Sequence, residues 1–104
     1  KTPFVKNDQL SAWHLYILNI DFKKLKIDRK SFINKLYKKG IITQVHYIPT
    51  FKQPAFKRLK KNLYKNTISY YSSCLSLPIF YDLGIKKARY VVKIVKSLIK
   101  NYKK

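Results

Sequence analysis

The chain has 104 residues, the length of a single domain with one modest core. Apolar residues make up 46% of it, which argues against disorder, and its single cysteine, Cys74, excludes an internal disulfide. The formal net charge is +20, from 24 lysines and arginines against 4 aspartates and no glutamate, and such a charge favours anionic partners.

The excess of positive charge has two interpretations. Twenty-one of the 24 cations are lysine, whereas proteins that read base edges rely on the forked guanidinium of arginine. The abundant residues Lys, Asn, Ile, Tyr and Phe also share A/T-rich codons, so much of the charge is compositional. We do not favour nucleic acid as a partner, but a small basic module that binds nucleic acid or another polyanion stays open as an alternative function.

No apolar stretch is long enough to span a bilayer, and the first residues lack the apolar segment of a signal peptide. A lone cysteine fits a reducing compartment. The sequence therefore predicts a cytoplasmic protein without a membrane partner.

Residues 1–10 show no period and contain Pro3, so we interpret them as a linker or as the end of an upstream domain. The domain itself is expected over residues 11–104. Within it, residues 11–20 alternate as in a strand, and because both faces are largely apolar the strand should be central.

A helix is predicted next. Asp28 is a plausible N-cap, and the apolar residues that follow it have helical spacing. Gly40, after two lysines that suit the carboxyl end of a helix dipole, should end this helix. The apolar residues in question are Phe32, Ile33, Leu36 and Tyr37.

The second half of the chain predicts further short elements. A second strand is expected over residues 41–48, and helices are expected over 54–64 and 66–75. Pro78 should close a very short third strand around Ser76-Leu77. The best amphipathic helix covers residues 86–102 and carries the apolar stripe Ala88, Val91, Val92, Val95, Leu98, Ile99 and Tyr102.

These elements predict an α+β fold. A small sheet of about three strands, covered on one face by helices, is the simplest way to bury the apolar stripes. The other face of that sheet would need a cover or a larger partner.

The residues alone do not provide a complete catalytic set. The spacing of the aspartates is typical of turns and caps rather than of acid–base chemistry. Cys74 with His14 or His46 could form a nucleophile and its base, but Cys74 lies in an apolar stretch predicted to be helical, where cysteine is usually packed and inert. Metal-ligand spacing is also absent, so no metal site is predicted.

The remaining polar candidates lie at the end of the second strand. In a strand, Gln44 and His46 would point to one face, and Val45 and Tyr47 to the other. From the residues alone, a polar sheet edge with a merely hydrogen-bonded His46 is the better interpretation, and a binding site is the alternative.

Several motifs occur in a characteristic order: Ser11-Ala12-Trp13-His14-Leu15-Tyr16, then Phe32 with Leu36 before Gly40-Ile41, then Gln44-Val45-His46-Tyr47-Ile48-Pro49, and finally Leu75-Ser76-Leu77-Pro78 before an amphipathic helix. In this order they resemble the C-terminal small domain of the DegT/DnrJ/EryC1/StrS family of sugar aminotransferases that use pyridoxal phosphate (PLP). The form Gly-Ile-x-Thr-Gln-Val-His-Tyr-x-Pro is most similar to the UDP-4-amino-4,6-dideoxy-N-acetyl-altrosamine transaminases of pseudaminic acid biosynthesis.

The resemblance implies the small domain of a fold-type I PLP aminotransferase. The intact enzyme would transfer an amino group from glutamate to a UDP-linked 4-keto-6-deoxy hexose, for surface-glycan or flagellin sugars. Its partners would be a large domain, which carries the Schiff-base lysine, and the second subunit of a homodimer. By position, the resemblance implies that the sugar nucleotide or the cofactor contacts Gln44, His46, Tyr47, Ile48 and Pro49.

The same resemblance limits what this chain does alone. None of its lysines lies in a matching motif, so no catalytic residue is assigned and no cofactor is expected on the isolated chain. His14 matches by position and receives no role. An inert remnant of the aminotransferase stays open as a further alternative.

Overall fold

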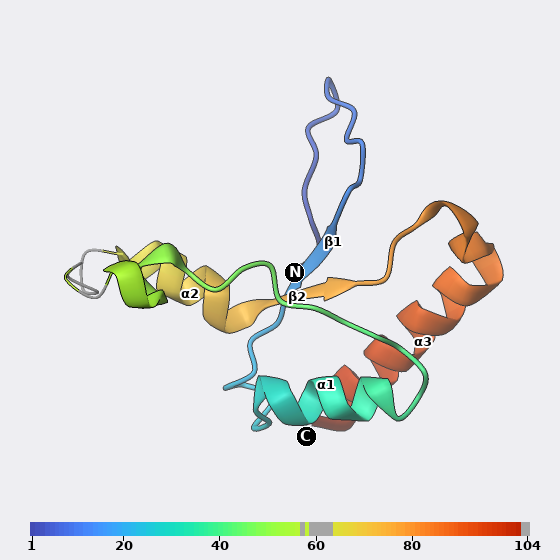
Figure 1. Cartoon of the computed structure of the whole chain (residues 1–104). Helices are drawn as coiled ribbons and strands as arrows, with labels where there is room; N and C mark the ends of the chain where they lie inside the picture. Colours follow the sequence, from blue (N-terminus) through green and yellow to red (C-terminus); the bar gives the residue numbers. More distant parts are fainter. Residues whose placement is uncertain (57, 59–63, 103–104) are drawn as a thin grey trace.

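A computed structural model describes residues 1–56, 58 and 64–102 of the chain. In Figure 1, α1 and α3 lie together below the crossing strands, while α2 extends away to the left. The elements in chain order are β1 (Tyr16–Asn19), α1 (Arg29–Tyr37), the 3₁₀ helices η1 (Thr50–Lys52) and η2 (Pro54–Phe56), α2 (Lys65–Ser73), β2 (Cys74–Leu77), η4 (Tyr81–Leu83) and α3 (Gly84–Tyr102).

The sheet is built around β2. Its residues pair antiparallel with β1, in the register Tyr16 with Leu77 and Leu18 with Leu75. Gln44 forms an isolated bridge with Ser76. The predicted α+β class with a small helix-covered sheet is confirmed, because the antiparallel strands pack on one face against α1 and α3. The second expected strand, over residues 41–48, is reduced to the Gln44 bridge, so the sheet has two strands rather than about three.

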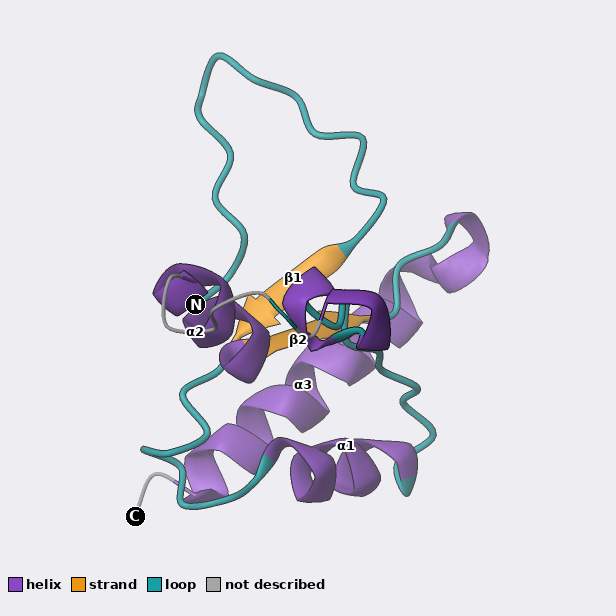
Figure 2. Ribbon diagram, turned by 60° about the vertical axis from the view of Figure 1, so that its left-hand side comes forward, coloured by secondary structure: helices purple, strands orange, loops and turns teal. Residues whose placement is uncertain are grey.

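The core lies between one face of this sheet and the helices α1 and α3. Successive strand residues point to opposite faces, so Leu75 and Leu77 point to the same side of the sheet. They pack there with residues of both helices, which lie on one side of the strands in Figure 2. The buried cluster consists of Leu18, Ile20, Phe22, Leu25, Phe32, Leu36, Ile41, Leu75, Leu77, Val91 and Val95.

The first predicted strand, residues 11–20, is wrong over most of its length. Only Tyr16–Asn19 is a strand, and the preceding residues form the long loop that projects at the top of Figure 2. The pairing explains the boundary: Tyr16 lies opposite Leu77, and the next position on the partner is Pro78, which has no N–H to donate. Trp13 also has a φ of 47°, outside the extended region.

Helix α1 confirms the local signals that predicted it. The Asp28 side chain accepts a hydrogen bond of 2.9 Å from the backbone N–H of Ser31, as an N-cap does. Phe32 and Leu36 have no exposed surface. Gly40 turns the chain after the helix with a φ of 73°, where a side chain would be strained.

The helix predicted over residues 66–75 forms, but it ends two residues early. The structure has α2 over Lys65–Ser73, with no buried residue, and Cys74 and Leu75 belong to β2 instead. Arg29 stabilises the change from α2 to β2. Its guanidinium donates to the carbonyls of Tyr71 and Cys74 and lies 4.7 Å from the centre of the Tyr71 ring. Of the helix predicted over 54–64, η2 covers the start, and residues 57 and 59–63 lie outside the described residues.

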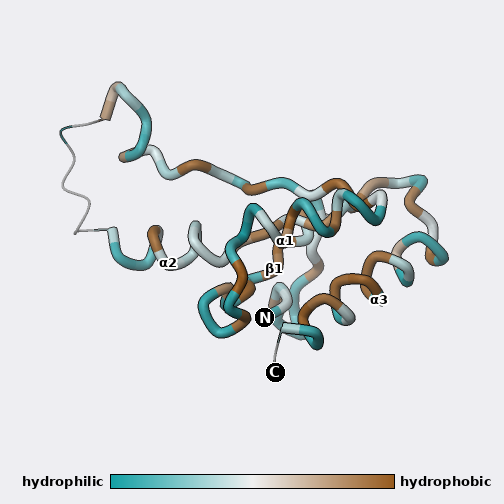
Figure 3. The backbone as a smooth tube through the Cα atoms, turned by 90° about the horizontal axis from the view of Figure 1, so that it is seen from below, coloured by the Kyte–Doolittle hydropathy of each residue, from teal (hydrophilic) through white to brown (hydrophobic). Residues whose placement is uncertain are grey.

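Helix α3 begins at Gly84, slightly before the predicted start, and hydrophobic and hydrophilic runs alternate along it in Figure 3. Val91 and Val95 are buried, but Val92 is 46% exposed. Val92 therefore lies at the margin of the stripe and not in the core, contrary to the expectation from spacing. In the described part of the chain, no helix combines the length and apolar content needed to cross a membrane.

The two valines provide a matched test of the core. Val95→Asp should abolish the cooperative thermal melt followed by circular dichroism, because an unpaired buried charge costs several kcal/mol against a total stability of about 5–15 kcal/mol. Val92→Asp makes the same change in the same helix at a half-exposed position and should cost about 1 kcal/mol or less. A parent-like melt of Val95→Asp would show that the assigned helix face is wrong.

The N-cap of α1 predicts a pH dependence. The hydrogen bonds from Ser31 hold the pKa of the Asp28 carboxyl below its ordinary value of 3.8. Because this pKa is lowered in the folded state, the stabilisation is present above the ordinary value and is lost as the pH falls through the lowered one. Melting temperatures measured from neutral to acidic pH should therefore converge for the wild type and Asp28→Ala. Asp28→Asn, which still caps, should show a smaller difference from the wild type at neutral pH. Equal stability of all three proteins at neutral pH would contradict the cap.

Candidate functional site

The candidate site is the segment from Gln44 to Pro49, which runs along the outer edge of β2. Two backbone hydrogen bonds attach it: Ser76 N–H donates to the Gln44 carbonyl at 2.8 Å, and Gln44 N–H donates to the Ser76 carbonyl at 3.2 Å. Pro49, which cannot donate to a ladder, is buried and immediately precedes η1 as its N-cap residue. The segment is therefore fixed at both ends while its middle leaves the sheet.

His46 is held by the same strand. Its Nδ1 lies 2.7 Å from the Oγ of Ser76, a hydrogen-bonding distance, and Ser76 is 4% exposed. The imidazole also contacts the Tyr47 ring edge to face, with centroids 4.6 Å apart and planes inclined by 76°. The His46–Tyr47 peptide bond is cis.

The predicted site residues differ in how far they are open to a ligand. Gln44 is exposed, Tyr47 is 69% exposed and Ile48 is 55% exposed, while His46 is half-buried. Packing of both His46 and Tyr47 inside the core would have favoured a purely structural interpretation. The structure does not show such packing, because Tyr47 is exposed. The structure brings all of these residues to one edge of the molecule, and their contact with a ligand stays a prediction.

The alternative pair of Cys74 with a histidine is not formed. Cys74 is buried as the first residue of β2, and its sulfur lies 3.8 Å from an Arg29 nitrogen and 3.5 Å from the Tyr71 carbonyl oxygen. Burial raises the pKa of the Cys74 thiol, which disfavours the reactive thiolate. The interpretation of Cys74 as a packed residue agrees with this placement, although Cys74 belongs to β2 and not to the predicted helix.

The described residues do not form a PLP site by themselves. Such a site needs an enclosed lysine amine and an acid beside the pyridine nitrogen. Every lysine whose placement is described is exposed, and so are the four aspartates, of which Asp28 caps α1 and Asp21 pairs with Lys24 at 3.8 Å. Nor do the described His, Cys and Asp residues gather as metal ligands.

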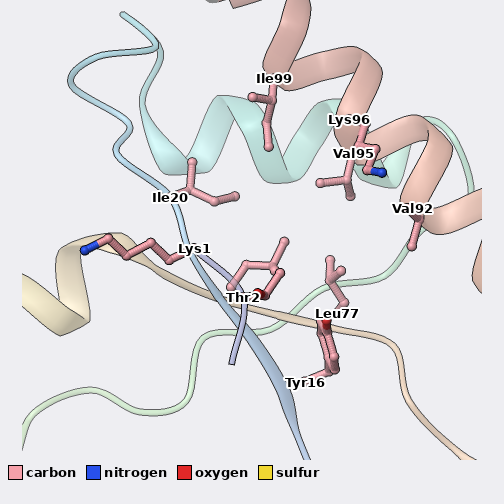
Figure 4. A pocket seen from close by; sticks show the side chains of 10 residues that line it. Lys1, Thr2, Tyr16, Ile20, Leu77, Val92, Val95, Lys96 and Ile99 are labelled. Atoms are coloured by element: carbon pink, nitrogen blue, oxygen red, sulfur yellow. The ribbon is translucent and has the colours of Figure 1, made fainter. Parts of the chain in front are cut away.

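An apolar cavity of about 380 Å³ lies on the core face of the sheet, between the strands and α3 (Figure 4). Tyr16, Leu77, Val92 and Ile99 line it, with Lys96 at α3. Because Leu77 and Ser76 point to opposite faces of β2, this cavity is separated from the His46 edge by the sheet.

Sequence reasoning missed Ser76 as a functional candidate. Ser76 belongs to Leu75-Ser76-Leu77-Pro78, a motif that was interpreted as a strand only. One signal in the sequence could have pointed to Ser76. Two short strand-like motifs both end in proline, at Pro49 and Pro78, and two such motifs can pair edge to edge, as Gln44 and Ser76 do.

Comparison with known proteins establishes the family. The model of the DegT/DnrJ/EryC1/StrS aminotransferase family matches residues 1–96. The chain belongs to this family. Its members are PLP-dependent sugar aminotransferases.

The relatives cover nearly all of this chain. The uncharacterized protein MJ1066 of Methanocaldococcus jannaschii is 37% identical over 101 residues, and the spore coat polysaccharide biosynthesis protein SpsC of Bacillus subtilis is 34% identical over 103. These matches cover 94% and 95% of this chain and 26% of each relative. The chain thus spans about a quarter of the length of the curated relatives that it matches.

The expected subgroup is not singled out. The UDP-4-amino-4,6-dideoxy-N-acetyl-beta-L-altrosamine transaminase of Campylobacter jejuni is 28% identical over 101 residues, covering 96% of this chain and 27% of the relative, an identity below that of SpsC and MJ1066. The comparisons therefore establish the family and leave the sugar substrate to a proposal.

Solved structures agree on the fold. Helicobacter pylori PseC, an aminotransferase involved in the biosynthesis of pseudoaminic acid, matches with a TM-score of 0.73 at 26% identity, over 85% of this chain and 24% of PseC. The apo form of Spr1654, a putative sugar aminotransferase from Streptococcus pneumoniae, matches with a TM-score of 0.84 at 24% identity, over 97% of this chain and 26% of that one.

Proposed function

We propose that this chain is the C-terminal domain of a PLP-dependent nucleotide-sugar aminotransferase, with the domain proper over residues 11–104 and a connection to a large domain over 1–10. The complete enzyme moves an amino group from glutamate to a UDP-linked 4-keto-6-deoxy hexose, in the cytoplasm, for surface-glycan or flagellin sugars. Family membership supports the reaction type, and the PseC and altrosamine transaminase matches support this class of substrate.

PLP, bound by the large domain, supplies the electron sink for amino transfer. The residues of this chain have a different task, which is to bind and orient the sugar nucleotide. The observation that carries this proposal is the edge formed by Gln44, His46, Tyr47 and Ile48, which β2 holds rigidly while leaving polar and aromatic groups open. A positioned wall of this kind reduces the entropy cost of orienting a substrate.

The charge of the chain supports the same substrate class. All four aspartates are exposed, and the formal net charge is +20, so the potential around the edge favours an anionic diphosphate. This field acts at long range and is screened by salt, whereas the His46 edge provides short-range contacts. The two contributions can therefore be separated by ionic strength.

The test uses the complete enzyme, in which this chain follows its large domain. His46→Ala should lower kcat/KM for the sugar nucleotide by roughly one to three orders of magnitude, the range for loss of a positioned polar group, while the enzyme still folds and unfolds cooperatively. His14→Ala is the matched control, because His14 is the other histidine of the chain and is exposed.

Parent-like kinetics of His46→Ala, together with a lowered melting temperature, would show that His46 has only a structural role. Equal kinetic losses in both histidine variants would also contradict the assignment, because they would trace the effect to general disturbance of the domain.

A further inference from the structure

We infer that Ser76 is the residue that positions His46, and that it does so by donating its hydroxyl proton to Nδ1. The imidazole is thereby held in the tautomer that carries its proton on Nε2, and His46 presents a single N–H donor to the open edge. The inference about the Ser76–His46 hydrogen bond is independent of the proposed function. The inference that the Nε2 N–H binds substrate rests on the proposed function.

Ser76 contacts the segment in three places. Its backbone N–H and carbonyl both bond to Gln44, and its side chain reaches the ring of His46 two residues further on. Ser76 itself is 4% exposed within a strand whose residues are all buried. A ring held from such a rigid element is fixed in orientation as well as in place.

The direction of the proton follows from burial. A serine hydroxyl has one proton to donate, and a buried donor without an acceptor is unfavourable. Among the described residues, the acceptor at hydrogen-bonding distance from this hydroxyl is Nδ1 of His46. If Nδ1 instead carried the proton and donated to Oγ, the hydroxyl proton would lose this acceptor. The neutral ring therefore accepts at Nδ1 and has its N–H at Nε2, on the far side of the ring.

An outward N–H selects the ligand chemistry. It pairs with an oxygen acceptor and cannot accept a hydrogen bond from an ammonium group. His46 can therefore pair with an oxygen acceptor and not with the ammonium group of glutamate. Under the proposed function, that oxygen belongs to the sugar nucleotide, either in the diphosphate or in the sugar. Ser76 is a positioning residue in this arrangement, because it acts through His46.

The first test is the ¹⁵N spectrum of the imidazole nitrogens in the 104-residue chain, recorded in mildly alkaline buffer. His14→Gln assigns the signals, because the chain has two histidines. We expect His46 to show an unprotonated Nδ1 and a protonated Nε2. In Ser76→Ala the signals should shift toward a mixture of both tautomers, and Ser76→Thr, which keeps a hydroxyl, should restore the single tautomer.

The control is Ser73→Ala. Ser73 is a half-buried serine whose hydroxyl donates to Asn19 and not to a histidine, so this variant should leave the His46 signals unchanged. A protonated Nδ1 in the wild type overturns the inference, and so does a Ser76→Ala spectrum identical to that of the wild type. If Ser76→Ala fails to fold, the wild-type spectrum alone decides.

The second test measures kinetics in the complete enzyme. Ser76→Ala should raise KM for the sugar nucleotide about three- to tenfold, the range for one misaligned hydrogen bond, and leave KM for glutamate unchanged. Inhibition by UDP alone separates the two oxygen sources: a weaker inhibition in Ser76→Ala indicates the diphosphate, and an unchanged inhibition indicates the sugar. A change in the KM for glutamate instead overturns the assignment to the sugar nucleotide.

The two tests distinguish an error in this inference from an error in the proposed function. If the tautomer is as expected but neither Ser76→Ala nor His46→Ala alters sugar-nucleotide kinetics, the proposed function of this edge is wrong, although the Ser76–His46 hydrogen bond stands. If the tautomer is reversed while His46→Ala still impairs the enzyme, the proposed function stands and the positioning by Ser76 is wrong.

Discussion

The structure depends on β2, a strand of four residues that has neighbours on both edges and both faces. One edge pairs with β1 and the other bridges to Gln44. Leu75 and Leu77 point into the core with α1 and α3, whereas Cys74 contacts Arg29 and Ser76 contacts His46. A strand enclosed in this way holds β1 and the Gln44–His46 segment in defined positions.

This arrangement separates the residues that stabilise the domain from those that are proposed to contact a ligand. The apolar face of β2 and the buried face of α3 supply the burial that stabilises the domain. The opposite face and the outer edge supply hydrogen bonds that orient His46 and the open residues beside it. Substitutions at the exposed edge should therefore alter the proposed substrate contacts without opening the core.

The sequence predicted the elements that depend on local signals. Helix α1 follows from the Asp28 cap and apolar spacing, and α3 follows from its periodic stripe. The prediction was wrong where contacts between distant residues determine the structure. Residues 41–48 alternate like a strand, but among them only Gln44 forms a bridge to β2. The contact between His46 and Ser76 joins residues 30 positions apart, so no local pattern could reveal it. Motif resemblance, not periodicity, identified the edge as a candidate site.

The central claim is that this chain provides a substrate-orienting wall and that the cofactor lysine belongs to the large domain. Borohydride reduction in the presence of PLP, followed by peptide mapping, tests it most directly. We expect no stoichiometric, fold-dependent lysine adduct on the 104-residue chain, and one adduct in the complete enzyme at a lysine outside this chain. A single stoichiometric adduct on a lysine of this chain that disappears on unfolding would contradict the claim.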